Sequence, residues 1–256
     1  MTPGRLPLLS VLTAAAFVPS PPLLVPQLAS GAAQETDRLR RAALGVASRL
    51  GESCEEWTAF GVAEPGLPFI AEVGPESSGT FQGFGVDVRV CLSPDASAAA
   101  VDPSMPLAAL IAAWLRGQAA PASKVRVRVL APDTPADQCA QLGAALRREL
   151  DARRSRQALL VVADGANTLT KKAPGAFDPR SEQVQAALDA ALAEGDCGAL
   201  DHLDAALCQS IGLAGRAAWQ TLSAVFGGEA GGPRKSESLY VGAPYGVGYH
   251  VGMWLP

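Results

Sequence analysis

The sequence predicts an α/β protein, built as a single three-layer α/β/α domain with a largely parallel central sheet. Segments of strand length alternate along the chain with segments of helical periodicity, which places helices on both faces of a sheet. Residues 158–163 read Ala-Leu-Leu-Val-Val-Ala, a continuous apolar run typical of a strand buried on both faces. The chain has 256 residues, 48% of them hydrophobic and 18% charged, which suits one globular core.

The N-terminal segment allows two interpretations. Arg5 and the apolar residues 6–18 resemble a secretory signal, and the small residues 31–33 would suit a cleavage site. The interpretation that we prefer is a loose leader at 1–10 and a first core strand at 11–18, because similar apolar strands recur later. The domain then covers residues 11–256. No apolar run reaches the roughly 20 residues that a membrane span needs.

The first half of the domain combines one helix with short strands. Apolar residues recur at helical spacing between residues 34 and 50, which predicts an amphipathic helix. Residues 57–62 read as a short strand, and residues 65–85 are too rich in glycine and proline to assign. Apolar and polar residues then alternate at 86–91, which predicts a half-buried strand.

The second half begins with a helix at 105–116 and an alternating strand at 124–129, expected near a sheet edge. A helix follows at 135–150, with Thr134 placed to cap it and Pro135 at its first position. After the buried strand, the pattern predicts three more helices, a glycine-rich surface loop and a closing strand. The helices are expected at 181–193, 199–209 and 215–226, the loop at 227–232 and the closing strand at 240–254.

Charge and cysteine content restrict the class of protein. The net charge of −4 does not favour nucleic acid or an anionic membrane as a partner. The five cysteines are odd in number and form no C-x-x-C pair, which argues against a disulfide framework or a zinc ribbon. Reduced thiols indicate a cytoplasmic protein. A small-molecule ligand fits this profile, and self-association into a homo-oligomer stays open.

Ligands of open α/β sheets bind at the carboxyl ends of the strands. This rule selects Ser20 after the first strand, Glu64 after the second, and residues 164–167 after the buried one, with Asp164 and Asn167 as the polar groups. A serine-nucleophile elbow, a phosphate-binding loop and an H-E-x-x-H pair are absent from the sequence.

Asp164 ends a buried strand, so we expect its carboxylate to be partly desolvated and to need a partner. Lys172 and Asp178 follow closely, and an aspartate–lysine pair there would hold an anionic or hydroxylated ligand. The alternative is that the lysine only rigidifies the loop. His202 is expected to be a solvated surface residue. His250 lies near Tyr245 in the closing strand, where it is either a structural histidine or the candidate base or proton donor.

Seven short segments, taken in order, resemble the superfamily of class III extradiol ring-cleavage dioxygenases and their B-type subunits, in particular its actinobacterial branch. The resemblance spans nearly the whole chain. The segments are VPSPPLLVP at 18–26, GVDV at 85–88, ADG at 163–165, KAPG at 172–175, DPR at 178–180, GRAAWQ at 215–220 and APYGVGY at 243–249.

The resemblance implies a single α/β/α domain. It also implies an enzyme that binds Fe²⁺ through two histidines and a glutamate, uses another histidine for proton transfer, and opens catechol rings with dioxygen. This chain departs from that pattern. Ser20 stands where the first histidine ligand is expected, Glu64 follows the second strand, and residues 164–167 replace the catalytic histidine. Serine is a poor ligand for ferrous iron compared with imidazole.

Three hypotheses follow. The first is a protein of dioxygenase fold without a metal or cofactor, which binds a small polar or aromatic molecule in the remnant pocket. That pocket would be lined by Ser20, Glu64, Asn167, Lys172, Asp178 and Tyr245, with Asp164 or His250 handling protons. The second is a non-catalytic structural or partner-binding subunit. The third is a residual iron enzyme with unusual ligands.

Overall fold

The computed structural model describes residues 11–29, 31, 34, 36–64, 71–227 and 231–256. The segment 1–10, with the leader or signal-like interpretation, lies outside the described residues, as does part of the expected loop at 227–232. Residue 11 is followed at once by a strand, as expected for the start of the core.

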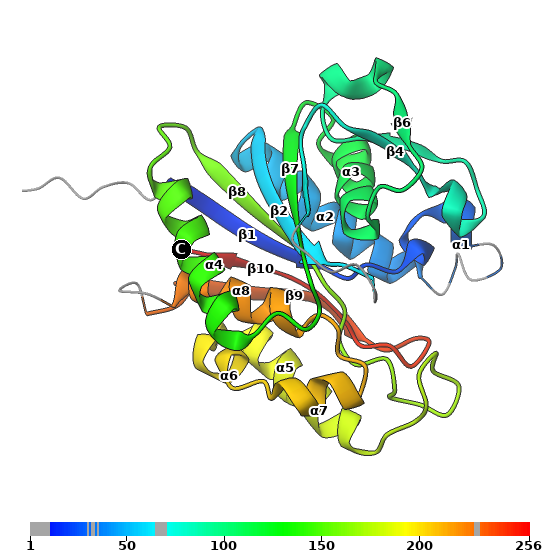
Figure 1. Cartoon of the computed structure of the whole chain (residues 1–256), viewed down its shortest axis with the longest axis vertical. Helices are drawn as coiled ribbons and strands as arrows, with labels where there is room; N and C mark the ends of the chain where they lie inside the picture. Colours follow the sequence, from blue (N-terminus) through cyan, green and yellow to red (C-terminus); the bar gives the residue numbers. More distant parts are fainter. Residues whose placement is uncertain (1–10, 30, 32–33, 35, 65–70, 228–230) are drawn as a thin grey trace, which may run out of the picture.

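The main sheet has seven strands in the order β3-β7-β2-β8-β1-β10-β9 (Figure 1). The four central strands, from β7 to β1, are parallel to one another, and β3, β10 and β9 are antiparallel to their neighbours. The strand bounds are β1 Leu12–Val18, β2 Glu56–Val62, β3 Ala71–Val73, β7 Lys124–Leu130, β8 Gln157–Val162, β9 Lys235–Gly242 and β10 Tyr249–Leu255. The prediction of a sheet that is parallel at its centre is confirmed.

Helices cover both faces of this sheet (Figure 1). One apolar core lies under α2 and α3, and a second lies under α4, α5 and α8. The helix bounds are α1 Pro26–Ala29, α2 Asp37–Ser53, α3 Leu107–Ala119, α4 Ala136–Asp151, α5 Arg180–Glu194, α6 Cys197–Asp201, α7 Ala205–Ser210 and α8 Arg216–Phe226. The three-layer α/β/α fold is therefore confirmed. No helix in the described part of the chain combines the length and apolarity that crossing a bilayer requires.

Strand β8 explains why the sheet centre is apolar throughout. Leu160 and Val162 contribute to the first core, whereas Leu159 and Val161 contribute to the second. Each is 1% exposed or less. Full burial of such a side chain stabilises a fold by about 1.5–3 kcal/mol relative to exposure. The prediction from residues 158–163 is confirmed.

A second, three-stranded sheet lies where the sequence pattern is irregular. Its order is β5-β4-β6, with β4 Ser78–Thr80, β5 Arg89–Cys91 and β6 Val101–Asp102. The prediction of a strand at 86–91 is wrong for residues 86–88, which precede β5. The N–H of Val88 donates to the carbonyl of Val86, and the Asp87 carboxylate accepts from the Thr80 hydroxyl, so these residues form a turn.

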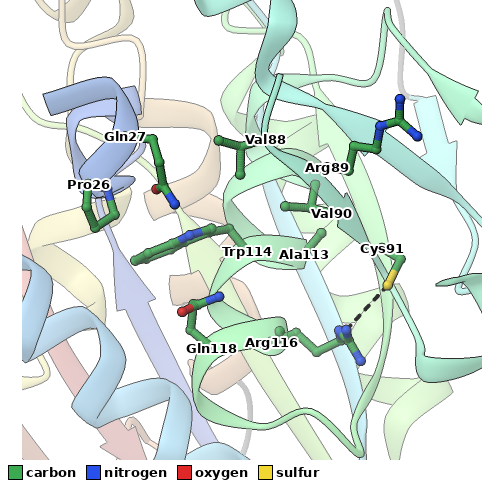
Figure 2. Close-up of a pocket in the computed structure, with 11 residues that line it drawn as sticks. Pro26, Gln27, Val88, Arg89, Val90, Cys91, Ala113, Trp114, Arg116 and Gln118 are labelled. Atoms are coloured by element: carbon green, nitrogen blue, oxygen red, sulfur yellow. Dashed lines mark hydrogen bonds between the residues drawn. The ribbon is translucent and has the colours of Figure 1, made fainter. Parts of the chain in front are cut away.

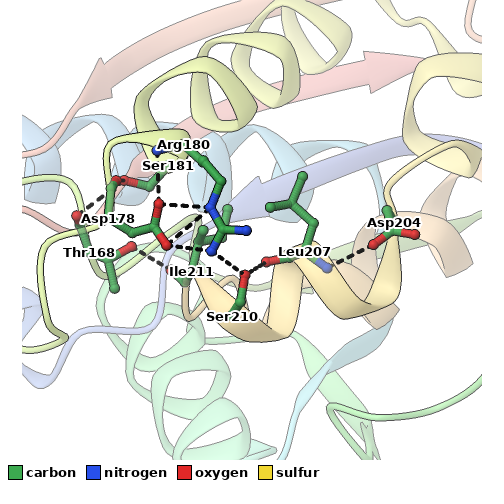
Figure 3. Close-up of polar contacts among 8 residues, drawn as sticks. All are labelled: Thr168, Asp178, Arg180, Ser181, Asp204, Leu207, Ser210 and Ile211. Atoms are coloured by element: carbon green, nitrogen blue, oxygen red, sulfur yellow. Dashed lines mark hydrogen bonds and ion pairs between the residues drawn. The ribbon is translucent and has the colours of Figure 1, made fainter.

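Capping corrects two helix predictions. The helix expected at 199–209 is two helices, because the Asp204 carboxylate accepts from the N–H of Leu207 and begins α7 (Figure 3). Thr134 does not cap α4, since its hydroxyl donates to the carbonyl of Ala131 and Pro135 occupies the N-cap position.

The prediction of a single closing strand at 240–254 is also wrong in its first half. The chain forms an antiparallel hairpin there, in which β9 is the first strand and β10 the second.

Candidate functional site

Ser20 and Asp164 meet at the carboxyl ends of two adjacent parallel strands, β1 and β8. The backbone N–H of Ser20 donates to Oδ1 of Asp164 at 2.7 Å. The Ser20 hydroxyl lies 2.7 Å from Oδ2, to which it donates whenever the carboxyl is ionised. The structure therefore brings together two residues that the strand-end rule selected separately.

The surroundings of Asp164 favour its protonated form. Burial raises the pKa of this carboxyl above its ordinary value, and the hydrogen bonds from Ser20 oppose that rise only in part. Tyr249 lies close by and is 4% exposed. Burial raises the pKa of its phenol, and the negative charge of Asp164 raises it further. The site thus holds a carboxyl whose pKa is raised by burial and a phenol that stays protonated.

A turn between β9 and β10 closes against the residues that follow β8. The N–H of Gly165 donates to the carbonyl of Gly248, and the N–H of Gly248 donates to the carbonyl of Ala166. Tyr245 lies on the same turn, where the carbonyl of its neighbour Gly246 accepts from the N–H of Leu169 in the loop after β8. Ser20, Asp164 and Tyr245 therefore share one region. In the sequence Tyr249 is only an aromatic neighbour, and its adjacency to this glycine-rich turn is the available signal.

The other predicted ligand-binding residues make different contacts. Asn167 packs its side-chain amide against Gly212, where a Cβ atom would collide with it. Glu64 and Lys172 are exposed. Both carboxyl oxygens of Asp164 bond to Ser20, so the expected pairing of Asp164 with a lysine is wrong. Asn167 and Asp178 therefore take part in loop contacts, whereas Ser20 contacts Asp164 directly.

Asp178 belongs to a polar cluster that holds the loop after β8 against α7 (Figure 3). Its carboxylate forms an ion pair with Arg180 at 2.6 Å, and the same guanidinium donates to the hydroxyl of Ser210. Hydrogen bonds to Arg180 lower the pKa of Asp178 to about 2. The Thr168 hydroxyl donates to the carbonyl of Ile211. These contacts rigidify the loop, which is a structural role.

His250 lies on the opposite face of the sheet from Tyr249, the phenol near Asp164. Successive residues of a strand point to opposite faces, so Tyr249 contributes to the first core while His250 contacts Phe17 of the second. Nδ1 of His250 lies 2.9 Å from Oδ1 of Asp189, and Nε2 lies 2.7 Å from the hydroxyl of Ser238. His202 is exposed, as expected.

Gln185, on α5, joins the two polar regions. Its Oε1 accepts from the N–H of Ala166 at 2.8 Å, and its Nε2 donates to Oδ1 of Asp189 at 3.1 Å. A hydrogen-bonded path therefore runs from the loop after Asp164 to the ring of His250.

A pocket of about 180 Å³ lies apart from this region, between α1, α3 and β5 (Figure 2). Trp114 and Arg116 of α3 line it together with Gln27 and Cys91. Arg116 is 6% exposed and donates to the carbonyl of Pro121 and to the sulfur of Cys91. The sequence did not indicate this pocket, because part of its wall belongs to the small sheet.

The residues present do not fit the iron site that the dioxygenase resemblance implies. Ser20 offers a hydroxyl in place of an imidazole, and both ring nitrogens of His250 are bonded on the other face of the sheet. Nowhere in the described residues do three histidine, cysteine, aspartate or glutamate side chains come together as a metal-binding group. A donor set without imidazole is unsuited to ferrous iron.

The comparisons with known proteins concern the fold. No protein-family model matches the chain, and no curated protein matches it in sequence. The crystal structure of an uncharacterized protein, JW3007 from Escherichia coli K12, is similar with a TM-score of 0.52 and 12% sequence identity. The similarity covers 94% of this chain and 99% of that one. At this identity the likeness shows a shared α/β architecture, and it extends over nearly the whole of both chains.

Proposed function

We propose that this chain is a metal-independent protein of dioxygenase-like fold that binds a small hydroxylated aromatic molecule at the Ser20–Asp164 pair. One observation supports this most strongly. Two hydrogen bonds of 2.7 Å join a serine to a desolvated carboxyl at the strand ends where ligands of α/β sheets bind. In the family that the sequence resembles, a metal ligand is expected at the position of Ser20.

The proposed chemistry is hydrogen bonding and proton exchange. A protonated Asp164 donates its own hydrogen to the Ser20 hydroxyl, which releases the serine hydrogen toward a ligand oxygen. An ionised Asp164 reverses that direction and accepts from the serine. The pair therefore serves either a donor or an acceptor on the ligand, and Tyr249 adds a second protonated hydroxyl.

Titration calorimetry with catechol as the probe, in the presence and absence of EDTA, tests this proposal. We expect the same affinity in both conditions, and a loss of about 10-fold or more in Ser20→Ala and Asp164→Asn, because a hydrogen bond to a charged or desolvated group contributes about 1.5–3 kcal/mol. Ser210→Ala, in the distant loop cluster, is the matched control and should bind like the wild type. Binding that requires iron, or that survives both site substitutions, would refute the proposal.

A second candidate is the binding of an organic anion in the pocket beside Arg116. Within the described residues this guanidinium has no acidic partner within 4 Å, and its buried Nε has no hydrogen-bond partner. Buried charges are normally paired, so a ligand carboxylate would supply the missing charge. Benzoate is the probe, and we expect it to slow alkylation of Cys91 by iodoacetamide. Unchanged alkylation of Cys91 at millimolar benzoate would exclude this candidate.

A further inference from the structure

We infer that Ser238, His250 and Asp189 form a separate site in which a serine nucleophile, its histidine base and an orienting carboxylate cleave esters of small acyl groups. The three residues come from β9, β10 and α5. Nε2 of His250 faces the serine hydroxyl at 2.7 Å, and Nδ1 faces Asp189 at 2.9 Å. This is the arrangement of serine hydrolases, in which one ring nitrogen takes the serine proton while the other is held by a carboxylate.

The exposure of each group matches its role. His250 is buried, with its side chain 2% exposed, and the Asp189 side chain is 20% exposed. Ser238 is exposed to solvent. Phe17 packs an aromatic edge against the imidazole, with ring centroids 5.4 Å apart. The base is therefore fixed within the protein, while the nucleophile remains open to a substrate.

The backbone of β9 is irregular at this point. Ser238 pairs with Gly252 and Tyr240 pairs with Val251, so Leu239 is an extra residue in the strand. Such bulges redirect side chains and are frequent next to active sites. Beyond the bulge, Val241 pairs with His250 and so lies on the same face of the sheet as that imidazole. Val241 is 50% exposed, which provides an apolar surface for the acyl group.

The outer edge of β9 offers backbone donors to a substrate. In the sheet as the structure describes it, β9 is the last strand and has a neighbour on one side only. Backbone N–H groups along its free edge can hold the oxyanion of an acyl-transfer reaction.

The reaction has two balanced steps. The Ser238 oxygen bonds to the ester carbonyl carbon as its proton passes to Nε2 of His250, and the leaving alcohol departs with that proton. Water then attacks the acyl-serine, gives a proton to Nε2, and releases the carboxylic acid as Ser238 recovers its hydrogen. Asp189 is a positioning residue, because it bonds to the imidazole and to Gln185.

A purely structural explanation is that these bonds fasten the hairpin to α5. Ser236 provides the comparison, because it lies two residues earlier on β9 and its hydroxyl donates to the carbonyl of Ala193 on α5. Ser236 fastens the same strand to the same helix without a base. Ser238 differs in that its partner is an imidazole nitrogen.

Labelling with a fluorophosphonate, followed by intact mass measurement and peptide mapping, tests the inference. We expect a single adduct at Ser238, its loss in Ser238→Ala, and its retention in Ser236→Ala. Asp189→Asn should slow labelling about 10-fold or more, because a misoriented imidazole is a poorer base, while the melting temperature stays close to that of the wild type. Hydrolysis of p-nitrophenyl acetate should follow the same order among the variants.

An unlabelled wild-type protein, or a label that maps to another residue, would overturn the inference. Equal labelling of Ser238 in the wild type and in Asp189→Asn would remove Asp189 from the site. Catechol binding at Ser20 involves a different group of residues, so failure of either proposal leaves the other standing.

Discussion

Replacing Gln185 with leucine should destabilise the protein by about 2–4 kcal/mol, because a single amide satisfies groups on two sides. Gln185 is 6% exposed and accepts from the N–H of Ala166 at 2.8 Å. Leucine has a similar volume but accepts nothing, so the buried N–H loses its partner at a cost of about 1–3 kcal/mol. The lost donor to Asp189 adds about 1 kcal/mol, as for an ordinary hydrogen bond.

Urea unfolding with an unchanged m value would measure this loss. Gln185→Glu is the informative companion variant, because its carboxylate still accepts from Ala166 but cannot donate to Asp189 unless it is protonated. We expect Gln185→Glu to recover stability as the pH falls and its carboxyl takes up a proton, whereas Gln185→Leu should not. A loss below about 0.5 kcal/mol in Gln185→Leu would show that solvent reaches the N–H of Ala166, and the reasoning from burial would be refuted.

Three further predictions concern pH and glycine. Because burial raises the pKa of Asp164, the wild type should lose stability as the pH rises through that raised value, whereas Asp164→Asn should not. Urea unfolding from about pH 4 to 8 measures this, and parallel curves of unfolding free energy against pH for the two proteins would contradict the prediction. Arg180 lowers the pKa of Asp178 to about 2, so the stability of this pair is complete above the ordinary value of 3.8 and is lost as the pH falls toward 2. In acid unfolding experiments, Asp178→Asn should therefore be less stable than the wild type above pH 3.8, and the stabilities of the two proteins should converge near pH 2. Gly45→Ala, in the interior of α2 with no atom within 4 Å of the new Cβ, should raise the free energy of unfolding by about 0.5–1 kcal/mol. Gly215→Ala should lower it by about 1–3 kcal/mol, because its Cβ would collide with the carbonyl oxygen of Asp164; thermal melts that rank these two variants the other way would be inconsistent with the packing.

Periodicity predicts the elements whose burial is uniform. The apolar run at 158–163 and the helical spacing at 34–50 each correspond to an element that is buried against one core or both. The small sheet escaped prediction because its strands are two or three residues long, too short for a period to show. The division between α6 and α7 depends on one aspartate cap, and a cap acts locally without changing the apolar pattern.

Residues of the candidate site could be predicted only where the strand-end rule for ligand binding in α/β sheets applies. Strand ends identified Ser20 and Asp164, because parallel strands finish at one edge of the sheet. Nothing in the sequence pairs Ser238 with His250, since the pairing depends on the hairpin register and a bulge. Asp189 stands on an unremarkable face of α5, and only the packing of that helix on β10 brings it to the imidazole.

The position of β10 has a consequence for how the protein folds during synthesis. This strand, near the C-terminus of the chain, pairs with β1, near its N-terminus, with Gly252 opposite Phe17. While the ribosome makes the residues in between, the side of β1 that β10 will cover stays open. Contacts between segments so far apart in sequence slow folding, and an uncovered strand edge can pair with another chain. A nascent chain halted before residue 249 should therefore bind chaperones or aggregate, even though its parallel strands and its helices have already been made.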